Sequence, residues 1–535
     1  MKDTFVIKIS GPAGSGIMQA GETLSKALNG LGFYTLVYPE YPSQIRGGDN
    51  NLQIVFSSQP VNSPQEKIDL LFAFNDTCLK NHLPEVKKGG LFFNYENLEI
   101  KAGEELVKNT AGLGFLWAIL GFGLETLQEQ IEVSFRNNKR ILETNLKAGA
   151  EGFLKGQKMF SPSFATLEVA CVKKFEAELV NLTGNEALVK GILAGGGGFA
   201  SIYPMTPVNT ILTLLAKEKK VTIFRPEDEI AGVNAAIGAA YAGKRALVAT
   251  SGGGFSLMVE GLGMAGMAEI PLVVVLGQRT GPSTGMATYS SQADLKFAID
   301  AGQGEFPRIV LTPGDLPELY HLGVEAFNLA ETYQVPVILM TDKFLAESRF
   351  SVEQGRMDPP ATPRGTRLAW RAGDYKRYET TPSGISPRAF PGQTTFLTNS
   401  YEHDEEGFSI DDAETRKKMM EKRMRKLAGL SGGFGVYGKG GGKGTLISWG
   451  STKGILLDFI RENPEYNLIH FWRAEPFPKE VTPILKKAKK IICVEGNYSG
   501  QMADLLELNT GVKVQRILKD DGRPFFKEEI ERLIK

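Results

Sequence analysis

Tyr203-Pro-Met-Thr-Pro207, Arg225-Pro-Glu-Asp-Glu229 and Ser251-Gly-Gly-Gly-Phe-Ser256 mark the stretch of sequence that decides the fold. Residues 230–243 place apolar side chains at helical spacing, and Ala246-Leu-Val-Ala-Thr250 has the composition of a short buried strand. The stretch therefore puts a cluster of acids at the start of a helix, beside a strand that ends in a glycine turn. In parallel α/β sheets, ligands bind at such strand ends.

Continuous aliphatic runs on both sides of this stretch predict more strands of the same sheet. They occur at residues 221–224, 272–276, 308–311 and 335–339. Runs of this kind are typical of parallel strands that helices cover on both faces. We therefore predict the α/β fold class, with this sheet at the centre of a domain that spans residues 186–350.

The length of 535 residues and the hydrophobic content of 42% predict three or four domains in all. The first, residues 1–180, is expected to open with a βαβ unit around the turn Gly11-Pro-Ala-Gly-Ser-Gly16. Its expected elements are a helix at residues 17–31 and strands at residues 5–9, 34–37 and 167–172. Asn181-Leu-Thr-Gly-Asn185 is predicted to be a polar bridge to the central domain.

Residues 351–443 differ from their surroundings, because they are rich in proline, glycine and charge and show few strand patterns. We expect a long connecting segment that runs over the surface or over a partner. Within it, residues 415–427 predict a basic amphipathic helix that faces solvent or a partner. Residues 444–535 return to the α/β pattern. Their expected elements are strands at residues 445–448 and 490–494 and a helix at residues 451–462.

Bulk composition excludes several classes of protein. Lysine plus arginine equals aspartate plus glutamate at 61 each, so no overall bias toward nucleic acid or an anionic membrane exists. No apolar run approaches the roughly 20 residues that span a bilayer. The first residues have a strand pattern and not that of a signal peptide. Cys78, Cys171 and Cys493 are scattered, so we expect buried thiols in a reducing cytoplasm and no metal site, cluster or disulfide within this chain.

The acidic motif Arg225-Pro-Glu-Asp-Glu229 allows two local interpretations. Acidic residues are favourable at the positive N-terminal end of a helix, so the motif by itself favours a helix cap. The motifs around it favour a cofactor site instead. They include Gln278-Arg-Thr-Gly-Pro-Ser-Thr-Gly285, which directly follows one of the predicted strands.

Taken in order, these motifs resemble the alpha subunit of the 2-oxoacid:ferredoxin oxidoreductases. The resemblance continues through Ser386-Pro-Arg-Ala-Phe-Pro-Gly392, Tyr401-Glu-His-Asp-Glu-Glu-Gly407, Trp449-Gly-Ser-Thr-Lys-Gly454, Glu495-Gly-Asn-Tyr-Ser-Gly-Gln501 and Asp521-Gly-Arg-Pro-Phe525. Residues 1–180 resemble the family's gamma subunit through Gly11-Pro-Ala-Gly-Ser-Gly16 and Arg46-Gly-Gly48. The resemblance covers nearly the whole chain as a gamma–alpha fusion. It implies a pyrimidine-binding thiamine diphosphate domain at residues 186–350 and a transketolase C-terminal-like domain at residues 444–535.

The resemblance implies an enzyme that oxidatively decarboxylates a 2-oxoacid, passes the acyl group to coenzyme A and sends electrons to ferredoxin. In this chemistry a carboxylate activates thiamine diphosphate through N1′ of its aminopyrimidine ring. Glu229 aligns best with that carboxylate, and Glu227 in the same cluster is the alternative. Thr206 matches the residue that approaches the substrate and the thiazolium ring, although a simple turn residue between prolines is the other interpretation. Tyr203, Gly252 and Gly253 are further candidates for cofactor binding.

Arg279 is the candidate for pairing with the substrate carboxylate, because arginine binds carboxylates in bidentate fashion. A loop arginine paired with a structural acid is the alternative. The candidates that line the pocket in the same loop are Ser283, Thr284 and Gln292. The fusion and this loop favour 2-oxoglutarate or a range of 2-oxoacids. Tyr289 lies where relatives that use 2-oxoglutarate often have a basic residue, so pyruvate, branched-chain and aryl 2-oxoacids remain open.

The Gly-Asp-Gly motif and following asparagine with which the family holds Mg²⁺ and the diphosphate are absent from this sequence. Gly48-Asp-Asn-Asn51 is compressed and lies in the wrong segment. A partner beta subunit is therefore expected to supply Mg²⁺, the diphosphate site and at least one [4Fe–4S] cluster, in a heterodimer or a dimer of heterodimers. The turn at Gly11–Gly16 is either a contact for a nucleotide or coenzyme A or a structural turn.

Two other functions fit the same motifs. One is half of a non-redox thiamine diphosphate enzyme, such as a decarboxylase, which needs no iron and no electron acceptor. The other is a non-catalytic assembly subunit that keeps the fold without the chemistry. The non-redox enzyme differs from the oxidoreductase in needing no electron acceptor. The assembly subunit differs in that Glu229→Gln would leave the activity of the complex intact.

Overall fold

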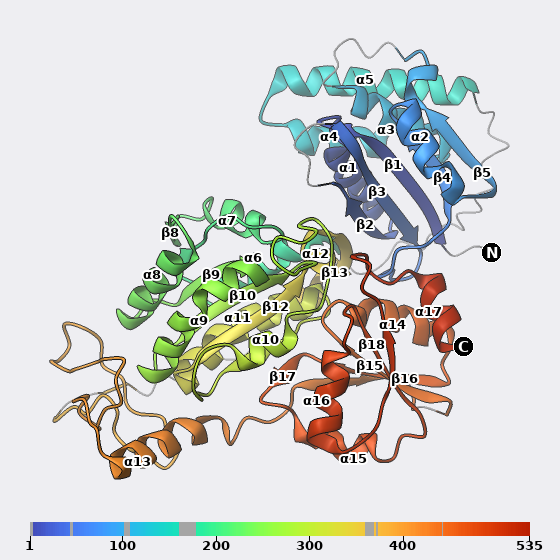
Figure 1. Cartoon of the computed structure of the whole chain (residues 1–535). Coiled ribbons are helices and arrows are strands. Elements are labelled where there is room, and N and C mark those ends of the chain that lie inside the picture. Colours follow the sequence, from blue (N-terminus) through green and yellow to red (C-terminus); the bar gives the residue numbers. More distant parts are fainter. Residues whose placement is uncertain are drawn as a thin grey trace. The chain divides into compact units, whose positions relative to one another are not determined.

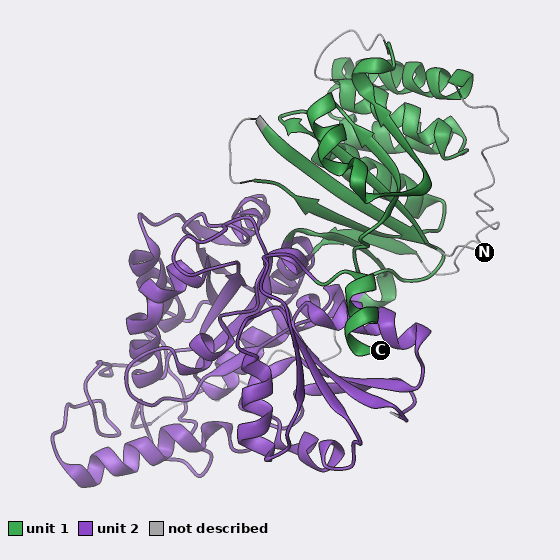
Figure 2. Ribbon diagram, turned by 45° about the vertical axis from the view of Figure 1, so that its right-hand side comes forward, with its two compact units in different colours: residues 1–183, 347–356, 525–535 green, residues 184–346, 357–524 purple. Residues whose placement is uncertain are grey.

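The computed structural model describes residues 4–42, 47–100, 107–159, 178–358, 369–370, 373–440 and 442–535. The chain forms two compact units (Figure 2). Unit 1 comprises Met1–Thr183, Glu347–Arg356 and Phe525–Lys535, and unit 2 comprises Gly184–Ala346 and Met357–Pro524. The strand predicted at residues 167–172, with Cys171, and Arg46 of the gamma-type motif lie outside the described residues.

Unit 1 contains a seven-stranded mixed sheet in the order β5-β4-β1-β3-β2-β13-β6. Its strands are β1 Thr4–Ala13, β2 Tyr34–Glu40, β3 Gly47–Ser57, β4 Ile68–Ala73, β5 Val86–Asn94, β6 Leu179–Thr183 and β13 Arg349–Glu353. β1 and β2 are both antiparallel to β3, which lies between them. The βαβ unit expected at the start is thus split by an inserted strand, while β4 and β5 pair parallel beside β1.

The two strands at one edge of this sheet come from distant parts of the chain. β6 pairs antiparallel with β13, and β13 pairs antiparallel with β2. Asn29, Thr35, Asn181 and Ser351 form a network of side-chain hydrogen bonds across this edge. The polar bridge predicted at residues 181–185 does contain the boundary between the two units, at Thr183 and Gly184, but it consists of the end of β6 and the start of α6.

The helices of unit 1 pack closely through glycines. They are α1 Ile17–Gly30, α2 Asp76–His82, α3 Lys108–Ile119, α4 Leu124–Phe135, α5 Lys139–Met159 and α17 Lys527–Ile534. Nearly all of α3 is buried. A Cβ atom on Gly152 of α5 would overlap the carbonyl oxygen of Ala111 in α3, and one on Gly114 of α3 would overlap the carbonyl oxygen of Gly149. The two backbones therefore approach each other more closely than any larger residue permits.

Unit 2 is built around a sheet of parallel strands in the order β11-β12-β10-β9-β7-β8, extended by antiparallel β17 (Figure 1). Its strands are β7 Phe199–Ser201, β8 Thr222–Phe224, β9 Ala246–Ser251, β10 Leu272–Gln278, β11 Ile309–Leu311, β12 Pro336–Asp342 and β17 Arg473–Glu475. The helices between them are α6 Gly184–Ala194, α7 Asn209–Leu215, α8 Glu229–Tyr241, α9 Gly252–Met267, α10 Leu295–Asp300, α11 Leu316–Tyr333 and α12 Lys343–Glu347. The parallel α/β sheet predicted for this region is confirmed.

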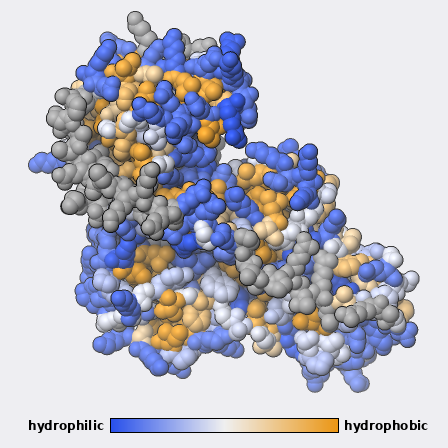
Figure 3. Space-filling view, turned by 180° about the vertical axis from the view of Figure 1, so that it is seen from behind, coloured by the Kyte–Doolittle hydropathy of each residue, from blue (hydrophilic) through white to orange (hydrophobic). Residues whose placement is uncertain are grey.

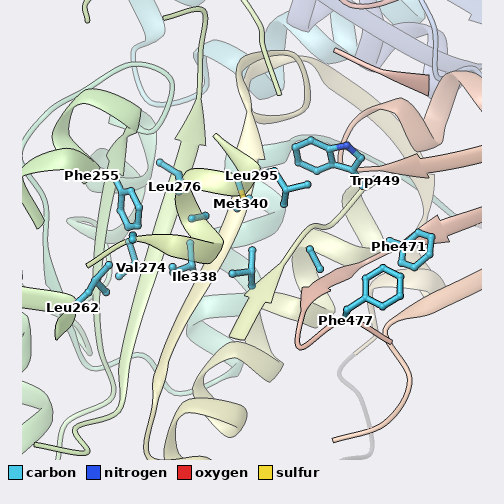
Figure 4. Close-up of a cluster of buried hydrophobic side chains, with 14 of the residues drawn as sticks. Phe255, Leu262, Val274, Leu276, Leu295, Ile338, Met340, Trp449, Phe471 and Phe477 are labelled. Carbon is cyan, nitrogen blue, oxygen red and sulfur yellow. The ribbon is translucent and has the colours of Figure 1, made fainter. Parts of the chain in front are cut away.

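The C-terminal part of unit 2 has a second sheet in the order β14-β16-β15-β18-β19. Its elements are β14 Phe434–Tyr437, β15 Gly444–Trp449, α14 Thr452–Glu462, β16 Tyr466–Phe471, α15 Thr482–Leu485, β18 Ile491–Glu495, α16 Gln501–Thr510 and β19 Gln515–Leu518. One apolar core joins the two sheets, with Phe255 and Leu276 at one end and Trp449, Phe471 and Phe477 at the other (Figure 4).

The connecting segment is fixed to unit 2 by buried charges. The basic helix is α13 Ala413–Met424, followed by a short turn at Arg425–Leu427. Its charged side chains were predicted to face solvent or a partner, and this was wrong for Lys422, Arg423 and Lys426, which are buried. The ammonium groups of Lys422 and Lys426 contact the two carboxylate oxygens of Glu269, at 2.7 and 2.6 Å, and all three side chains are buried. Arg423 is also buried and pairs with Glu402 at 2.6 Å. The lysines point inward because Glu269 lies in the interior.

The outer surface mixes polar and apolar side chains. On the face drawn in Figure 3, hydrophobic residues form separate patches among hydrophilic ones. Among the helices that the structure describes, none has the length and apolar character required to cross a membrane.

We predict that Gly152→Ala destabilises the chain by about 1–3 kcal/mol, the usual cost of overpacking, because the new methyl group overlaps the Ala111 carbonyl. Gly30→Ala is the matched control: it is also helical, and its nearest neighbour would lie 3.8 Å away. Urea unfolding of the full-length chain measures both variants. Equal stability of the two variants would contradict the close packing of α3 on α5.

Candidate functional site

The motifs singled out in the sequence follow successive strands of the unit 2 sheet. Tyr203-Pro-Met-Thr-Pro207 follows β7, the acidic motif follows β8, Ser251-Gly-Gly-Gly-Phe-Ser256 follows β9 and Arg279 follows β10. These strands are parallel neighbours, and the register pairs Ser251 with Gly277 at the ends of β9 and β10. Their carboxyl ends therefore bring all four motifs to one edge of the sheet, where ligands bind in open α/β folds.

The acids at the start of α8 have three different environments. Asp228 is the helix cap, because its Oδ1 accepts a hydrogen bond of 2.8 Å from the Ala231 backbone amide. Glu227 is exposed. Glu229 is the first residue of the helix and only 3% exposed. The capping function that the sequence suggested thus belongs to Asp228, and the Glu229 carboxyl group is free for another purpose.

The Glu229 carboxyl group lies against the first turn of α9. Thr250, at the end of β9, places its hydroxyl 3.5 Å from Glu229 Oε1. A Cβ atom on Gly254 would overlap both Thr250 Oγ1 and Glu229 Oε1. Glycine is required at position 254 for this reason, since any side chain there would occupy the space that holds the carboxylate.

The other two glycines of this turn face different neighbours. A Cβ atom on Gly252 would lie 2.7 Å from Asp294 Oδ2, whereas one on Gly253 would meet nothing nearer than the Ser283 carbonyl oxygen at 3.9 Å. The Glu229 and Asp294 carboxyl groups therefore flank the first turn of α9. Gly253 itself is exposed between them.

Thr206 and Arg279 lie together on the neighbouring loops. Arg279 Nη1 donates a hydrogen bond of 3.2 Å to the Thr206 carbonyl oxygen, and both residues are half-buried. Burial lowers the pKa of the Arg279 guanidinium. Arg279 has no carboxylate partner within the described part of the chain. Its remaining donors are thus available to an anion.

The other pocket candidates of the sequence are dispersed. Ser283 and Thr284 are exposed, and Tyr203 is 38% exposed. Gln292 is buried, with Nε2 donating 2.8 Å to the Trp449 carbonyl and Oε1 accepting 2.8 Å from the Gly496 amide. The Gln292 side chain thus joins the two sheets of unit 2, with a hydrogen bond at each end of its amide group.

Sequence reasoning missed Thr250, Gly254 and Asp294. The first two stand within quoted motifs, and their importance follows from contacts that spacing alone does not show. Asp294 lies beyond the loop motif, where nothing in the local sequence distinguishes it. Burial raises the pKa of its carboxyl group to about 6.

The glycine turn of unit 1 is a separate feature. Ser15 donates a hydrogen bond of 2.7 Å to the Pro12 carbonyl, and Gly14 and Gly16 have positive φ angles of 93° and 74°. Asn109 of α3 donates to the Gly16 carbonyl at 3.3 Å and occupies the space where a Cβ would lie. These contacts support the turn internally.

Within the described residues, no group of three or more histidine, cysteine, aspartate or glutamate side chains could hold a metal ion. Cys78 and Cys493 are buried, free thiols. Asp49, Asn50 and Asn51, which were rejected as a metal motif in the sequence, belong to β3 of unit 1.

Two family models match the sequence. The model "Pyruvate flavodoxin/ferredoxin oxidoreductase, thiamine diP-bdg" matches residues 190–422. The model "Pyruvate ferredoxin/flavodoxin oxidoreductase" matches residues 6–98 and 91–154. The first match includes the four motifs at the sheet edge and reaches into α13, and the second lies in unit 1.

Curated relatives align over almost the full length. The chain is 33% identical to the 2-oxoacid:ferredoxin oxidoreductase subunit alpha of a Sulfolobus species, over 98% of this chain and 96% of the relative. It is 28% identical to the 2-oxoglutarate oxidoreductase subunit KorA of Mycobacterium tuberculosis, over 100% of this chain and 91% of that protein.

A solved structure has the same fold. The 2-oxoglutarate:ferredoxin oxidoreductase from Magnetococcus marinus, with 2-oxoglutarate, coenzyme A and succinyl-CoA bound, matches with a TM-score of 0.91. The two chains are 28% identical, and the match covers 100% of each.

We predict that Asp294 makes stability depend on pH. An unfolded aspartate has a pKa of about 3.9, and the folded value of about 6 means that the folded state favours the protonated form. Folded-state stability therefore falls as pH rises from about 4 to about 6, by about 1–3 kcal/mol in total. Asp294→Asn should equal the wild type at pH 4 and exceed its stability at pH 8.

Urea unfolding of the full-length chain at both pH values tests this prediction. Asp300→Asn is the control, because Asp300 is exposed at the other end of α10. If Asp294→Asn changed stability equally at pH 4 and pH 8, the predicted preference of the folded state for a protonated Asp294 would be disproved.

Proposed function

The chain belongs to the family of 2-oxoacid:ferredoxin oxidoreductase alpha subunits, and on this premise we propose that it binds the pyrimidine ring of thiamine diphosphate. The enzyme oxidatively decarboxylates a 2-oxoacid, transfers the acyl group to coenzyme A and passes two electrons to ferredoxin. The observation that carries the proposal is the buried Glu229 carboxyl group, held in a space that only glycine at position 254 leaves open.

The residues at the sheet edge fit the pyrimidine half of the cofactor. A carboxylate must reach a ring nitrogen, and Glu229 is the buried acid of its motif, while Asp228 caps α8 and Glu227 is exposed. Gly253, exposed between the Asp294 and Glu229 carboxyl groups, has nothing within 3.9 Å of its Cβ position, so a planar ring can approach the backbone of α9 there. When bound, thiamine diphosphate supplies the carbon nucleophile that adds to the carbonyl group of the 2-oxoacid.

Glu229 acts by holding a proton at the ring nitrogen. Its burial excludes water, so a hydrogen bond from this carboxyl group is stronger than it would be in solvent. Thr250 acts on Glu229 and not on the substrate, because its hydroxyl lies 3.5 Å from Oε1 and limits rotation of the carboxyl group. The two residues keep one carboxylate oxygen in place while the other contacts the ring.

Arg279 and Thr206 form the substrate side of the site in this proposal. The hydrogen bond from Arg279 to the Thr206 carbonyl fixes one end of the guanidinium group. The other nitrogens can bind the carboxylate of the 2-oxoacid, and partial burial strengthens that pairing. Ser283 and Thr284 lie exposed in the following loop, where they can contact the rest of the substrate.

The substrate is a 2-oxoacid, and we propose a range that includes 2-oxoglutarate. The Sulfolobus relative is named for 2-oxoacids in general, whereas the Mycobacterium tuberculosis relative is named for 2-oxoglutarate. The solved Magnetococcus marinus enzyme holds 2-oxoglutarate and coenzyme A. In this chain Tyr289 belongs to the loop that packs on Gly522, so its position is fixed by the C-terminal part of unit 2.

The enzyme functions as a hetero-oligomer, since the relatives are named as alpha subunits. We assign Mg²⁺, the diphosphate site and a [4Fe–4S] cluster to a beta subunit, because the sequence lacks the motif that holds the metal in this family. Ferredoxin then receives electrons from the cluster of that subunit. Residues 1–180 contribute the gamma-type part within the same chain.

We predict that Glu229→Gln lowers the rate by about 10²–10⁴-fold, the usual effect of a general acid–base group, because the amide cannot exchange a proton with the ring. The complex is purified without oxygen together with its native partners, and 2-oxoacid-dependent viologen reduction is measured with coenzyme A. Glu227→Gln is the matched control in the same motif and should remain within about 3-fold of the wild type.

The outcomes separate the rival functions. Decarboxylation without viologen reduction, in a complex with intact clusters, would favour a non-redox thiamine enzyme. If the rate of viologen reduction is unchanged in Glu229→Gln, the result would favour the assembly subunit. A large loss in Glu227→Gln and none in Glu229→Gln would transfer the proposed role to Glu227.

We predict that Gly254→Ala lowers the affinity of the complex for thiamine diphosphate by at least about 10-fold, because the methyl group displaces the Glu229 carboxyl group. Gly238→Ala on α8 is the control, since a Cβ atom there would meet nothing within 4 Å. Calorimetric titration of the cofactor-free complex measures both variants. Wild-type affinity in Gly254→Ala would show that the position of this carboxylate is unimportant for binding.

A further inference from the structure

Asp294 occupies a defined place at the same sheet edge as Glu229. Its backbone amide donates a hydrogen bond of 3.1 Å to Oε1 of Gln278, the last residue of β10, which directly precedes Arg279. Its carboxyl oxygens lie 2.7 and 3.1 Å from the position of a Gly252 Cβ. The Asp294 side chain therefore lies between the ends of β9 and β10, across the first turn of α9 from Glu229.

The orientation of this side chain is unusual for its position. Asp294 is the N-cap residue of α10, yet its side chain makes no capping hydrogen bond. Three other aspartates in N-cap positions of unit 2, Asp228, Asp315 and Asp412, all accept one from their helix. The three capping aspartates have extended backbones, with ψ of −179°, 176° and 145°, whereas Asp294 has ψ of 8°. The backbone of Asp294 therefore directs its carboxyl group away from the start of α10 and toward Gly252 of α9.

No group within the described residues pairs with the Asp294 carboxyl group, and burial accounts for its raised pKa of about 6. The cations closest to it in sequence are engaged elsewhere: Lys296 pairs with Asp504, and Arg279 donates to the Thr206 carbonyl. Phe255 of α9 and Phe297 of α10 pack edge to face, with 5.1 Å between ring centroids, and fix the two helices beside it. In weak acid the carboxyl group is therefore a neutral hydrogen-bond donor in a rigid setting.

We propose that Asp294 is a specificity-determining residue, which in its protonated form donates a hydrogen bond to the carboxylate of the 2-oxoacid beside Arg279. The inference rests on the proposed function, because it takes the 2-oxoacid as the ligand of this edge. A neutral acid can lie next to an anion, whereas an ionised Asp294 repels it. Substrate affinity therefore falls as Asp294 loses its proton, while the chemical step at the cofactor is unchanged.

The test compares Asp294→Asn and Asp294→Ala with the wild type in the assembled complex from pH 5.5 to pH 8. In the wild type KM for the 2-oxoacid should rise about 10-fold or more across this range, the equivalent of a hydrogen bond to a charged group. Asp294→Asn keeps a donor and should hold KM low at every pH. Asp294→Ala should show a high KM at every pH, with kcat in both variants within about 3-fold of the wild type.

A second readout does not depend on turnover. Calorimetric titration with the corresponding 2-hydroxyacid, an unreactive carboxylate, should show the same loss of affinity with pH in the wild type and its absence in Asp294→Asn. Asp300→Asn controls for charge removal on the same helix, and it should behave as the wild type does.

The results distinguish this inference from the proposed function. If the wild-type complex shows no reduction that depends on a 2-oxoacid, the proposed function fails and the inference fails with it. If the complex is active and Asp294→Asn retains the wild-type rise of KM with pH, the function stands and the role of Asp294 is overturned. A loss of kcat in Asp294→Asn without a change in KM would likewise overturn it, since Asp294 would then act on the chemical step.

Discussion

The close approach of the Glu229 carboxyl group to the backbone of α9 is the constraint on which the site depends. The carboxylate and the Thr250 hydroxyl fill the space where a side chain at position 254 would lie. This contact holds α8 and α9 at the distance that buries one acid of the motif while its neighbours cap the helix or face solvent. Gly254 therefore contributes to the site because it has no side chain where the Glu229 carboxyl group lies.

The rest of unit 2 holds this arrangement rigid. Gln292 bonds to the Trp449 carbonyl and the Gly496 amide, and so ties the loop between β10 and α10 to the C-terminal sheet. Glu495, fully buried, accepts hydrogen bonds from the Trp449 indole at 3.0 Å and the Met502 amide at 2.8 Å. Both contacts place polar side chains in the interior together with their hydrogen-bond partners, which strengthens these bonds and fixes the two sheets against each other.

Buried charge also fixes the connecting segment. Glu269 pairs with two lysines from one helical stretch, so removal of this single carboxylate would leave two buried ammonium groups without an opposite charge, and Lys426 would keep only its hydrogen bond to the Gln334 carbonyl. Breaking a buried pair in this way is far more destabilising than replacing the whole group by apolar residues. The segment was predicted from its composition to be a long connection over the surface or over a partner, and these buried pairs make its basic helix part of the folded unit.

The sequence predicted the fold class, most strands of unit 2 and the edge at which the motifs meet, because aliphatic runs and glycine turns are local signals. It could not predict the pairing of β6 with β13, which brings together residues far apart in the chain. Nor could it show that Lys422 and Lys426 point inward, since their basic pattern is the same on an exposed helix. Glu229 was predicted as the site carboxylate from its motif, whereas Asp294 was noticed only from the proximity of its carboxyl group to Gly252 and the absence of a capping hydrogen bond.

The most direct test is a structure of the assembled complex with thiamine diphosphate bound. The account predicts that the Glu229 carboxyl group lies within hydrogen-bond distance of N1′ of the aminopyrimidine ring, with the ring against the first turn of α9. A ring nitrogen bound by Glu227, or a cofactor seated away from Gly252 and Gly254, would contradict it.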